Sequence, residues 1–266
     1  KVVLIRNLIS DQLQYINIAK EWFTLGDLLE IRKRKIGAGK IGGKAAGMLL
    51  AHRVLADTEE FDLSTCMSPP ESYYIGSNEI YTFMTINDLT HWNDQKYKSE
   101  EEMRAEYPAI VREFQAGEFP PDILDRLSAI LEKVEKQPMI VRSSSQLEDN
   151  FGTSFAGKYD SVFLPNQGPQ DQNLKDLTRA IATIYASTLN PNALLYRRAR
   201  GLQDYDERMA VLIQEVQGNR SGKYYFPHGA GVAFSRNTYR WAPQIRAEDG
   251  FVRLVWGLGT RAVDRV

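Results

Sequence analysis

The chain has 266 residues, of which 43% are hydrophobic and 25% are charged, as expected for a globular protein with a sizeable core. Lys and Arg together number 33 and Asp and Glu 34, so the formal net charge of −1 argues against a general nucleic-acid binder or a membrane-surface binder. The single cysteine, Cys66, excludes an intrachain disulfide, and the three histidines lie too far apart to suggest a zinc site.

The first third of the chain alternates amphipathic and glycine-rich segments. Apolar residues within 13–23 predict a helix. The basic run at 32–35 is interpreted as a solvated segment. A glycine-dense stretch, 36–48, then runs into a second predicted helix over 49–55. A strand is expected at 72–75, after two prolines.

Residues 76–136 are expected to be mainly helical. The clearest helix is 122–136, where apolar residues at helical spacing form one face and Pro121 stands at the start, a position that tolerates proline. Residues 139–141 predict a short buried strand. The polar residues 142–158 after it predict a loop.

The second half of the chain favours strands separated by polar loops. Strands are predicted at 160–164, 209–213, 231–234 and 251–256, with one amphipathic helix over 174–184. Because helices dominate the first half and strands the second, the order favours an α+β architecture over a regularly alternating doubly wound sheet.

The glycine-dense stretch is the first candidate site. Residues 37–42 fit G-x-G-x-x-G, but a basic run precedes them where a dinucleotide fold needs an apolar strand. A P-loop is excluded because Ala45 follows Gly43-Lys44 where the pattern requires Ser or Thr. Two interpretations stay open: backbone N–H groups and Lys44 presented to an anion at a helix N-terminus, or a helix-entry loop with a surface lysine.

A second candidate begins where the strand at 139–141 ends in Arg142. A guanidinium at a strand end can hold phosphate oxygens in bidentate fashion, and the hydroxyls of 143–145 can donate to phosphate. The alternative is an Arg142 that pairs with Glu148 or Asp149 in a polar loop.

The third candidate is Gln214-Glu215-Val216, where an apolar strand turns polar at its end. Backbone N–H and C=O groups there could read an adenine while apolar neighbours stack on it. A core strand with a polar exit is the more common explanation of such a pattern.

In this order, the segments resemble the ATP-binding domain of the phosphoenolpyruvate synthase and pyruvate phosphate dikinase family. The resemblance spans residues 42–259, and residues 1–36 contribute nothing to it. It is carried by Gly42-Gly43-Lys44-Ala45-Ala46-Gly47, Val141-Arg142-Ser143-Ser144, Glu148-Asp149, Ser154-Phe155-Ala156-Gly157, Gln214-Glu215-Val216, Gly231-Val232-Ala233-Phe234-Ser235-Arg236-Asn237 and Trp256-Gly257-Leu258-Gly259.

The resemblance implies an ATP-grasp fold, in which two α+β lobes hold ATP between them. Residues 1–36 would then be an N-terminal helical extension, 37–209 the first lobe with a helical insert, and 210–266 a truncated second lobe.

The resemblance also implies roles for single residues. Lys44 and Arg142 would contact the ATP phosphates. The remaining nucleotide-binding residues would be Gly42, Gly43, Ser143, Ser154 and Gly157 around the phosphates, with Gln214, Glu215 and Val216 at the adenine.

The implied magnesium site departs from the family pattern. After the Gly-Leu-Gly turn the family usually has a glutamate, whereas this chain has Thr260, a weaker ligand than a carboxylate. Thr260 and Asp264 are the expected Mg²⁺ ligands, and Glu248 and Asp249 are further candidates unless they cap a turn.

By resemblance, the parent enzyme splits ATP to AMP and phosphorylates a histidine on a carrier domain, which then phosphorylates pyruvate at a pyruvate/PEP-binding domain. None of the three histidines here has the sequence context of that carrier. The chain, which starts at Lys1 rather than Met, is interpreted as an excerpt of a longer cytoplasmic protein. We therefore expect it to bind ATP without full turnover.

Three alternatives stay open. Related dikinases phosphorylate other acceptors, such as a glucan or an antibiotic, and the acceptor is chosen by other domains. Thr260 could instead mark a lost magnesium site in a non-catalytic nucleotide-sensing module. The motif matches could also be chance features of a structural α+β domain.

Overall fold

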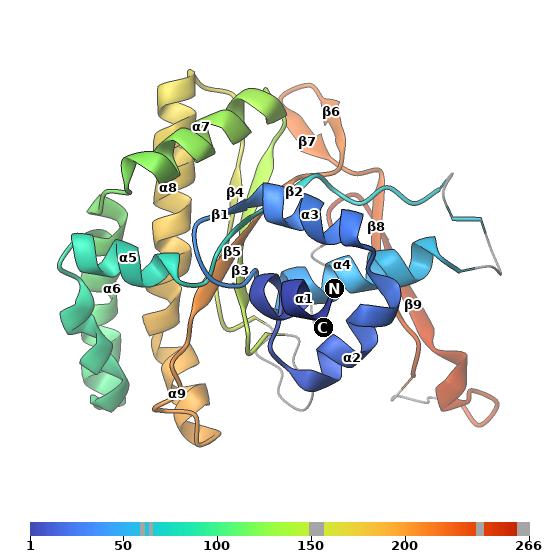
Figure 1. Cartoon of the computed structure of the whole chain (residues 1–266), viewed down its shortest axis with the longest axis horizontal. Coiled ribbons are helices and arrows are strands. Elements are labelled where there is room, and N and C mark those ends of the chain that lie inside the picture. The colour runs from blue at the N-terminus through green and yellow to red at the C-terminus, as the bar shows by residue number, and fades with distance from the viewer. Residues whose placement is uncertain (59–61, 64–65, 149–156, 238–241, 260–266) are drawn as a thin grey trace. The chain divides into compact units, whose positions relative to one another are not determined.

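The computed structural model describes residues 1–58, 62–63, 66–148, 157–237 and 242–259 (Figure 1). The chain divides into two compact units, Lys1–Glu215 and Val216–Val266. Helices and strands both contribute to it, so the expected α+β class is confirmed. Among the residues described, no helix combines the length and the apolar character needed to cross a membrane.

A five-stranded sheet with the order β1-β2-β5-β3-β4 lies at the centre of the first unit. β1 pairs with β2 in parallel, and every other pair is antiparallel. Successive side chains of a strand point to opposite faces, so Leu212 belongs to one core and its neighbours Val211 and Ile213 to the other. The strands are β1 (Lys35–Ile36), β2 (Ser72–Ile75), β3 (Met139–Ser145), β4 (Ser161–Leu164) and β5 (Met209–Glu215).

One face of the sheet packs against the helices that follow β2 (Figure 1). The predicted helix over 122–136 is confirmed as α7, which starts at Pro121 and buries its apolar stripe. Phe83 lies in the middle of this core, with its ring 5.9 Å from that of Phe114 and 5.5 Å from that of Tyr185. The helices are α5 (Glu79–Ile86), the 3₁₀ helix η1 (Thr90–Tyr97), α6 (Glu100–Ala116), α7 (Pro121–Val134), α8 (Gln170–Ala186), the 3₁₀ turn η2 (Ser187–Leu189) and α9 (Pro191–Ala199).

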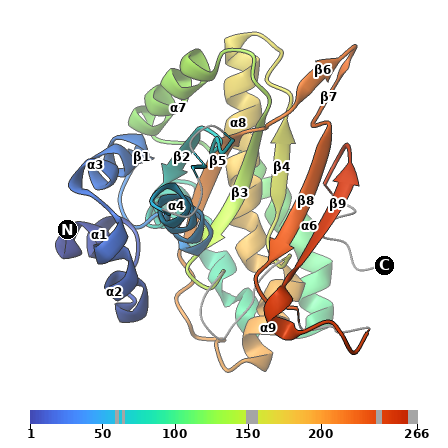
Figure 2. The same ribbon diagram turned by 90° about the vertical axis from the view of Figure 1, so that its right-hand side faces the viewer.

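The opposite face of the sheet packs against the helices from the start of the chain (Figure 2). The helix predicted within 13–23 is confirmed as α2, and α3 begins with a capping box between Thr24 and Asp27. Their apolar residues share a core with α4 and with Tyr74 and Leu212 of the sheet. These helices are α1 (Val2–Leu8), α2 (Leu13–Trp22), α3 (Leu25–Arg34) and α4 (Gly43–Ala56).

The loop predicted over 142–158 is wrong in its first part, because β3 continues to Ser145. Ser143, Ser144 and Ser145 pair with the apolar residues 209–211 of β5 and are fully buried. Serine is a poor predictor of a core strand, but a buried hydroxyl is tolerated once it has hydrogen-bond partners. Ser144 illustrates this, since its Oγ donates to the Ile41 carbonyl at 2.8 Å.

The second unit consists of short antiparallel hairpins. The strands predicted at 231–234 and 251–256 are confirmed as the pair β8–β9, in which Phe234 stacks on Phe251 with 4.7 Å between ring centres. Its elements are β6 (Asn219–Ser221), β7 (Tyr224–Phe226), β8 (Gly229–Phe234), the 3₁₀ turn η3 (Ala247–Asp249) and β9 (Phe251–Trp256).

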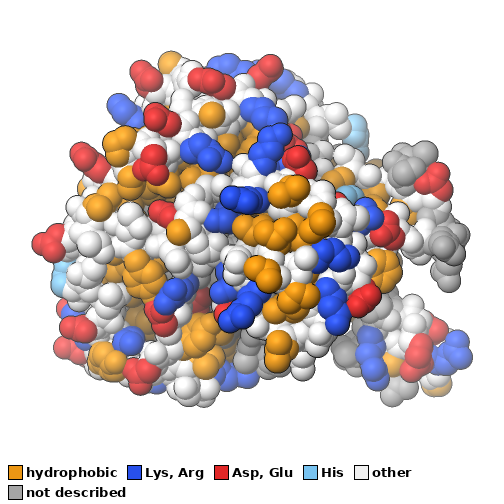
Figure 3. Space-filling model, in the orientation of Figure 1, with side chains coloured by type: hydrophobic (Ala, Val, Ile, Leu, Met, Phe, Trp, Pro, Cys, Tyr) orange, Lys and Arg blue, Asp and Glu red, His pale blue; other side chains and the backbone are white. Residues whose placement is uncertain are grey.

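The basic run closes α3 and enters β1, and Lys and Arg side chains gather where these elements meet α7 (Figure 3). Glu71 accepts from Arg34 Nη1 at 3.0 Å and from Lys133 Nζ at 2.7 Å. Arg126 on α7 donates to the carbonyl of Lys33 at 3.1 Å. Part of the basic run therefore anchors the sheet edge to the helices beside it.

Candidate functional site

The candidate site begins where the glycine turn before α4 meets the end of β3. A Cβ on Gly42 would lie 1.5 Å from the Ser144 carbonyl oxygen, and one on Gly43 would lie 2.0 Å from that of Glu148. Gly42 also has a φ of +81°, a backbone conformation that other residues rarely adopt. The two glycines are therefore required for α4 to start this close to β3.

Hydrogen bonds hold the start of α4 in this place. Ser144 Oγ donates to the Ile41 carbonyl at 2.8 Å and accepts from the Ala45 amide at 3.1 Å. The second bond occupies one of the amides that a helix N-terminus leaves without an intrahelical partner. One buried serine thus fixes both the glycine turn and the first turn of α4.

Lys44 lies in that first turn and reaches the end of β3. Its Nζ is 3.1 Å from Glu148 Oε1 and donates to Ser143 Oγ at 3.3 Å. Glu148 is almost completely buried, with 3% of its side chain exposed, while 21% of the Lys44 side chain is exposed. Glu148 also accepts from Ser143 Oγ at 2.9 Å and from the Ser145 amide at 3.0 Å.

The helix brings a second group of residues to the same strands. Met48 lies one turn after Lys44 on α4, at the i,i+4 spacing that places two side chains on one helix face. Its Sδ accepts from Gln214 Nε2 at 3.1 Å, and that amide also donates to Ser72 Oγ at 3.0 Å. Arg142 Nη1 donates to Gln214 Oε1 at 3.4 Å. The structure therefore places Arg142 and Gln214 in contact.

Arg142 has no carboxylate partner among the residues that the structure describes. Its only hydrogen bond there goes to Gln214, and its buried Nε has none. The alternative that Arg142 pairs with Glu148 is wrong, because Glu148 pairs with Lys44. Asp149 lies outside the described residues. Within the described part of the chain, Arg142 thus keeps donors for an anion.

The segment predicted to contact adenine, residues 214–216, lies at the end of β5, the central strand of the sheet. The register of β5 pairs Gln214 with β2 on one side and with β3 on the other. The Glu215 amide donates to the Glu71 carbonyl at 3.0 Å, and the Val216 carbonyl accepts from the Tyr225 hydroxyl at 3.2 Å. Several polar groups of this segment are thus engaged, and its adenine role stays a prediction.

The remaining predicted residues fall at or beyond the limits of the described chain. Gly157 has a φ of +71°, and no atom of the described residues lies within 4 Å of where a Cβ would be. Ser154, Thr260 and Asp264 lie outside the described residues. Asp249 caps a short turn, since its Oδ2 accepts from the Arg246 amide at 2.9 Å. In the parts of the chain that are described, no group of three or more His, Cys, Asp or Glu residues is arranged to hold a metal ion.

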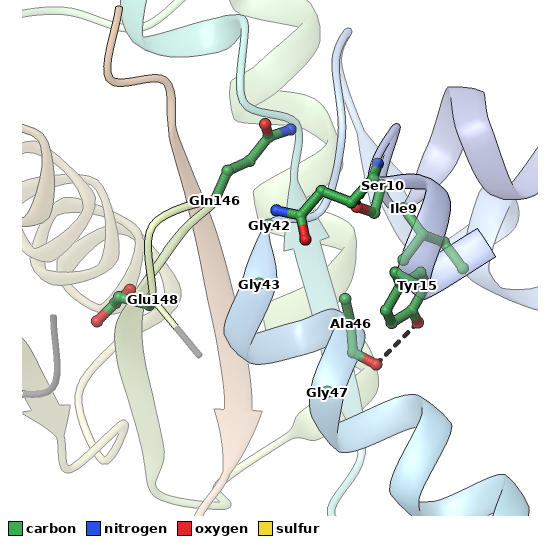
Figure 4. Close-up of a pocket in the computed structure, with 10 residues that line it drawn as sticks. Ile9, Ser10, Tyr15, Gly42, Gly43, Ala46, Gly47, Gln146 and Glu148 are labelled. Atoms are coloured by element: carbon green, nitrogen blue, oxygen red, sulfur yellow. Dashed lines mark hydrogen bonds between the residues drawn. The ribbon is translucent and has the colours of Figure 1, made fainter. Parts of the chain in front are cut away.

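A small pocket opens beside the glycine turn (Figure 4). In this view Gly42 and Gly43 lie between Glu148 on one side and Ser10 and Tyr15 on the other. The Tyr15 hydroxyl donates to the Ala46 carbonyl at 2.9 Å, which ties α2 to α4. The residues before β1 therefore help to shape the surroundings of the glycine turn.

A second buried carboxylate, Glu207, lies near the end of β3. Burial raises the pKa of Glu207, and the nearby Ser145 and the charge of Arg197 oppose this shift. The nearby charge of Glu148 raises the pKa further. The strand end that carries the candidate site thus has two buried acids close to it.

Sequence reasoning missed three contributors to the site. It considered Glu148 as a partner of Arg142 and did not assign Met48 or Ser72. The i,i+4 spacing from Lys44 could have indicated Met48. No local signal could have found Ser72, because it is 142 positions away from Gln214 in the chain.

Comparison with known proteins places this chain in a family. The sequence model of the pyruvate phosphate dikinase AMP/ATP-binding domain matches residues 38–266. This chain belongs to that family, which confirms the resemblance seen in the motifs.

Individual relatives match parts of the chain. A rifampicin phosphotransferase from Streptomyces sviceus is 32% identical over 44% of this chain and 12% of the relative. A phosphoenolpyruvate synthase from Aquifex aeolicus is 25% identical over 64% of this chain and 20% of the relative. One from Helicobacter pylori is 29% identical over 54% of this chain and 17% of the relative. The matched part of this chain therefore spans at most a fifth of the length of these relatives.

Proposed function

We propose that this chain is the nucleotide-binding part of a longer phosphotransferase and that it binds ATP with the phosphates at Lys44 and Arg142. Membership of an AMP/ATP-binding family supports the nucleotide. The observation that carries the assignment of residues is the charge on Arg142, which no carboxylate within the described residues neutralises. Lys44 adds a second cation, since it bonds to Ser143, the next residue along β3.

The chemistry fits phosphoryl transfer, which depends mainly on positioning and on neutralising phosphate charge. The Arg142 guanidinium is a planar fork that can hold two phosphate oxygens, whereas the Lys44 ammonium acts as a point charge. Backbone amides at the start of α4 would add a favourable dipole. Gly42, Gly43, Ser143, Ser154 and Gly157 would lie around the phosphates, and Gln214, Glu215 and Val216 at the adenine.

The phosphoryl group would pass to a histidine on a carrier domain elsewhere in the longer chain. Pyruvate, held by a pyruvate/PEP-binding domain, would be the final acceptor. Two of the relatives are phosphoenolpyruvate synthases, which supports this acceptor. We assign the fold to the ATP-grasp class as part of the same proposal.

Magnesium is proposed to bind at Thr260 and Asp264. When bound, it would neutralise phosphate charge as the phosphoryl group leaves. The described residues offer no carboxylate cluster for it, so nothing further in the proposal depends on this ion.

Another acceptor is the second candidate, because the Streptomyces relative is a rifampicin phosphotransferase. The ATP-binding step would be the same in both cases. A full-length protein that splits ATP only with pyruvate present would support the first candidate. A non-catalytic nucleotide-sensing module would bind ATP and split none.

The test is calorimetric titration of the chain with ATP, with and without Mg²⁺, for wild type, Lys44→Met and Arg142→Ala. We expect each substitution to weaken ATP binding at least about tenfold, because a hydrogen bond to a charged group contributes about 1.5–3 kcal/mol. Arg126→Ala is a matched control, since it removes an arginine that bonds to the Lys33 carbonyl and to none of the described residues that are proposed to bind phosphate. Wild-type affinity in both site variants would refute the phosphate assignment.

A further inference from the structure

We propose that Glu148 is a positioning residue that holds the Lys44 ammonium in place for the nucleotide phosphates. This inference rests on the proposed function, and it assigns a role that the motifs left open. Its basis is the set of contacts around the Glu148 carboxylate at the end of β3.

Glu148 is itself rigidly held. Its Oε2 accepts from the Ser145 amide at 3.0 Å, and its Oε1 accepts from Ser143 Oγ at 2.9 Å. Both donors belong to β3, which is paired on both sides in the sheet. With 3% of its side chain exposed, the carboxylate has little freedom to move. It is therefore a negative charge that two donors of β3 hold in place just after the strand ends.

Lys44 bonds to this fixed charge. An ammonium group has three N–H donors. Two of them are engaged, because Nζ lies 3.1 Å from Glu148 Oε1 and donates to Ser143 Oγ at 3.3 Å. The third has no partner among the described residues, and the Lys44 side chain is 21% exposed. The pair thus restricts a long, flexible side chain to one arrangement and leaves one donor for an anion.

The buried Glu148 carboxylate also depends on the positive charge of Lys44. A carboxylate removed from water is costly unless an opposite charge and hydrogen bonds compensate it. Serine and amide donors alone supply no charge. The structure therefore implies a reciprocal pair, in which the loss of Lys44 leaves a buried charge that the loss of Glu148 would relieve.

The test is a double-mutant cycle with Glu148→Gln, Lys44→Met and the combined variant. Each protein is titrated with ATP and, separately, with adenosine. We expect Glu148→Gln to weaken ATP binding about tenfold, because glutamine keeps the shape and removes the charge that holds Lys44. In the Lys44→Met background the same change should alter ATP affinity less than about twofold. Adenosine affinity should stay constant in every variant. A general loss of structure, by contrast, would lower the affinity for adenosine as well as for ATP.

Thermal unfolding without nucleotide tests the pairing itself. The combined variant should unfold at a higher temperature than Lys44→Met alone, because it no longer carries an unpaired buried carboxylate. Glu106→Gln is the control, since Glu106 accepts from Lys98 at 2.5 Å on α6, a helix of the opposite face. It should leave ATP affinity unchanged.

The outcomes separate the two proposals. Wild-type ATP affinity in Glu148→Gln, together with weak binding in Lys44→Met, would overturn the positioning role and keep the proposed function. Equal losses from Glu148→Gln in both backgrounds would also overturn it, because Glu148 would then act independently of Lys44. No ATP binding by wild type would refute the proposed function, and the positioning role with it.

Discussion

The glycine turn before α4 allows a sharp prediction, because Gly42 at the start of the helix and Gly47 inside it have opposite surroundings. A methyl group at Gly42 would overlap the Ser144 carbonyl oxygen, 1.5 Å away, and would sit on a residue with a φ of +81° and a ψ of 172°. At Gly47, inside α4, no atom of the described residues lies within 4 Å of the same methyl group. Identical substitutions should therefore change the free energy of unfolding in opposite directions.

The magnitudes follow from the structure. The backbone conformation of Gly42 is nearly restricted to glycine and costs other residues about 1–3 kcal/mol. Moving the turn away from Ser144 would also break the two bonds of its hydroxyl, to Ile41 and Ala45, each contributing about 1 kcal/mol. Gly42→Ala should therefore lose on the order of 4 kcal/mol. Gly47→Ala should gain about 0.5–1 kcal/mol from the higher helix propensity of alanine.

Urea unfolding of wild type and both variants measures these differences, and ATP titration gives an independent readout. Gly42→Ala should also weaken ATP binding, because the turn positions Lys44, whereas Gly47→Ala should not. A loss below about 1 kcal/mol for Gly42→Ala, with unchanged ATP affinity, would refute the close approach of α4 to β3 as the reason for this glycine.

Three further predictions concern the rest of the first unit. The fold raises the pKa of Glu207 above its ordinary value of 4.5. The stability that the Glu207 side chain contributes is therefore fully present below pH 4.5 and is lost as pH rises through the raised pKa. Urea unfolding between pH 4 and 8 should therefore show Glu207→Gln gaining stability relative to wild type as pH rises; a constant difference would contradict this. Thr24→Ala removes the capping box of α3 and should cost about 1 kcal/mol, whereas an unchanged urea midpoint would count against the cap. Phe83→Ala leaves a cavity among three aromatic rings and should cost about 3–5 kcal/mol in the same assay; a loss under about 1 kcal/mol would exclude tight packing there.

The pattern of apolar residues along the sequence was sufficient to predict a helix or strand where that element buries a single stripe or a continuous apolar run. The helix over 122–136 was predictable because its apolar residues recur at helical spacing and all face one core. The strand at 209–213 was predictable because it is apolar on both faces, as its central place in the sheet requires. The order of short motifs from Gly42 onward was sufficient to identify the family.

The extent of β3 was not predictable in this way. Residues 143–145 are serines, and a run of serines predicts a loop because the hydroxyls compete for backbone hydrogen bonds. They are strand because β5 pairs with them and buried partners accept or supply their hydrogen bonds. That information comes from segments far along the chain.

The sequence by itself determined which cations are available, since Lys44 and Arg142 stand in recognisable motifs. Only the tertiary structure decided which acid pairs with which cation. Glu148 is six positions from Arg142 and about a hundred from Lys44, yet it bonds to Lys44. The physical reason is that folding brings the start of α4 against the end of β3, and a buried carboxylate pairs with the cation that reaches it.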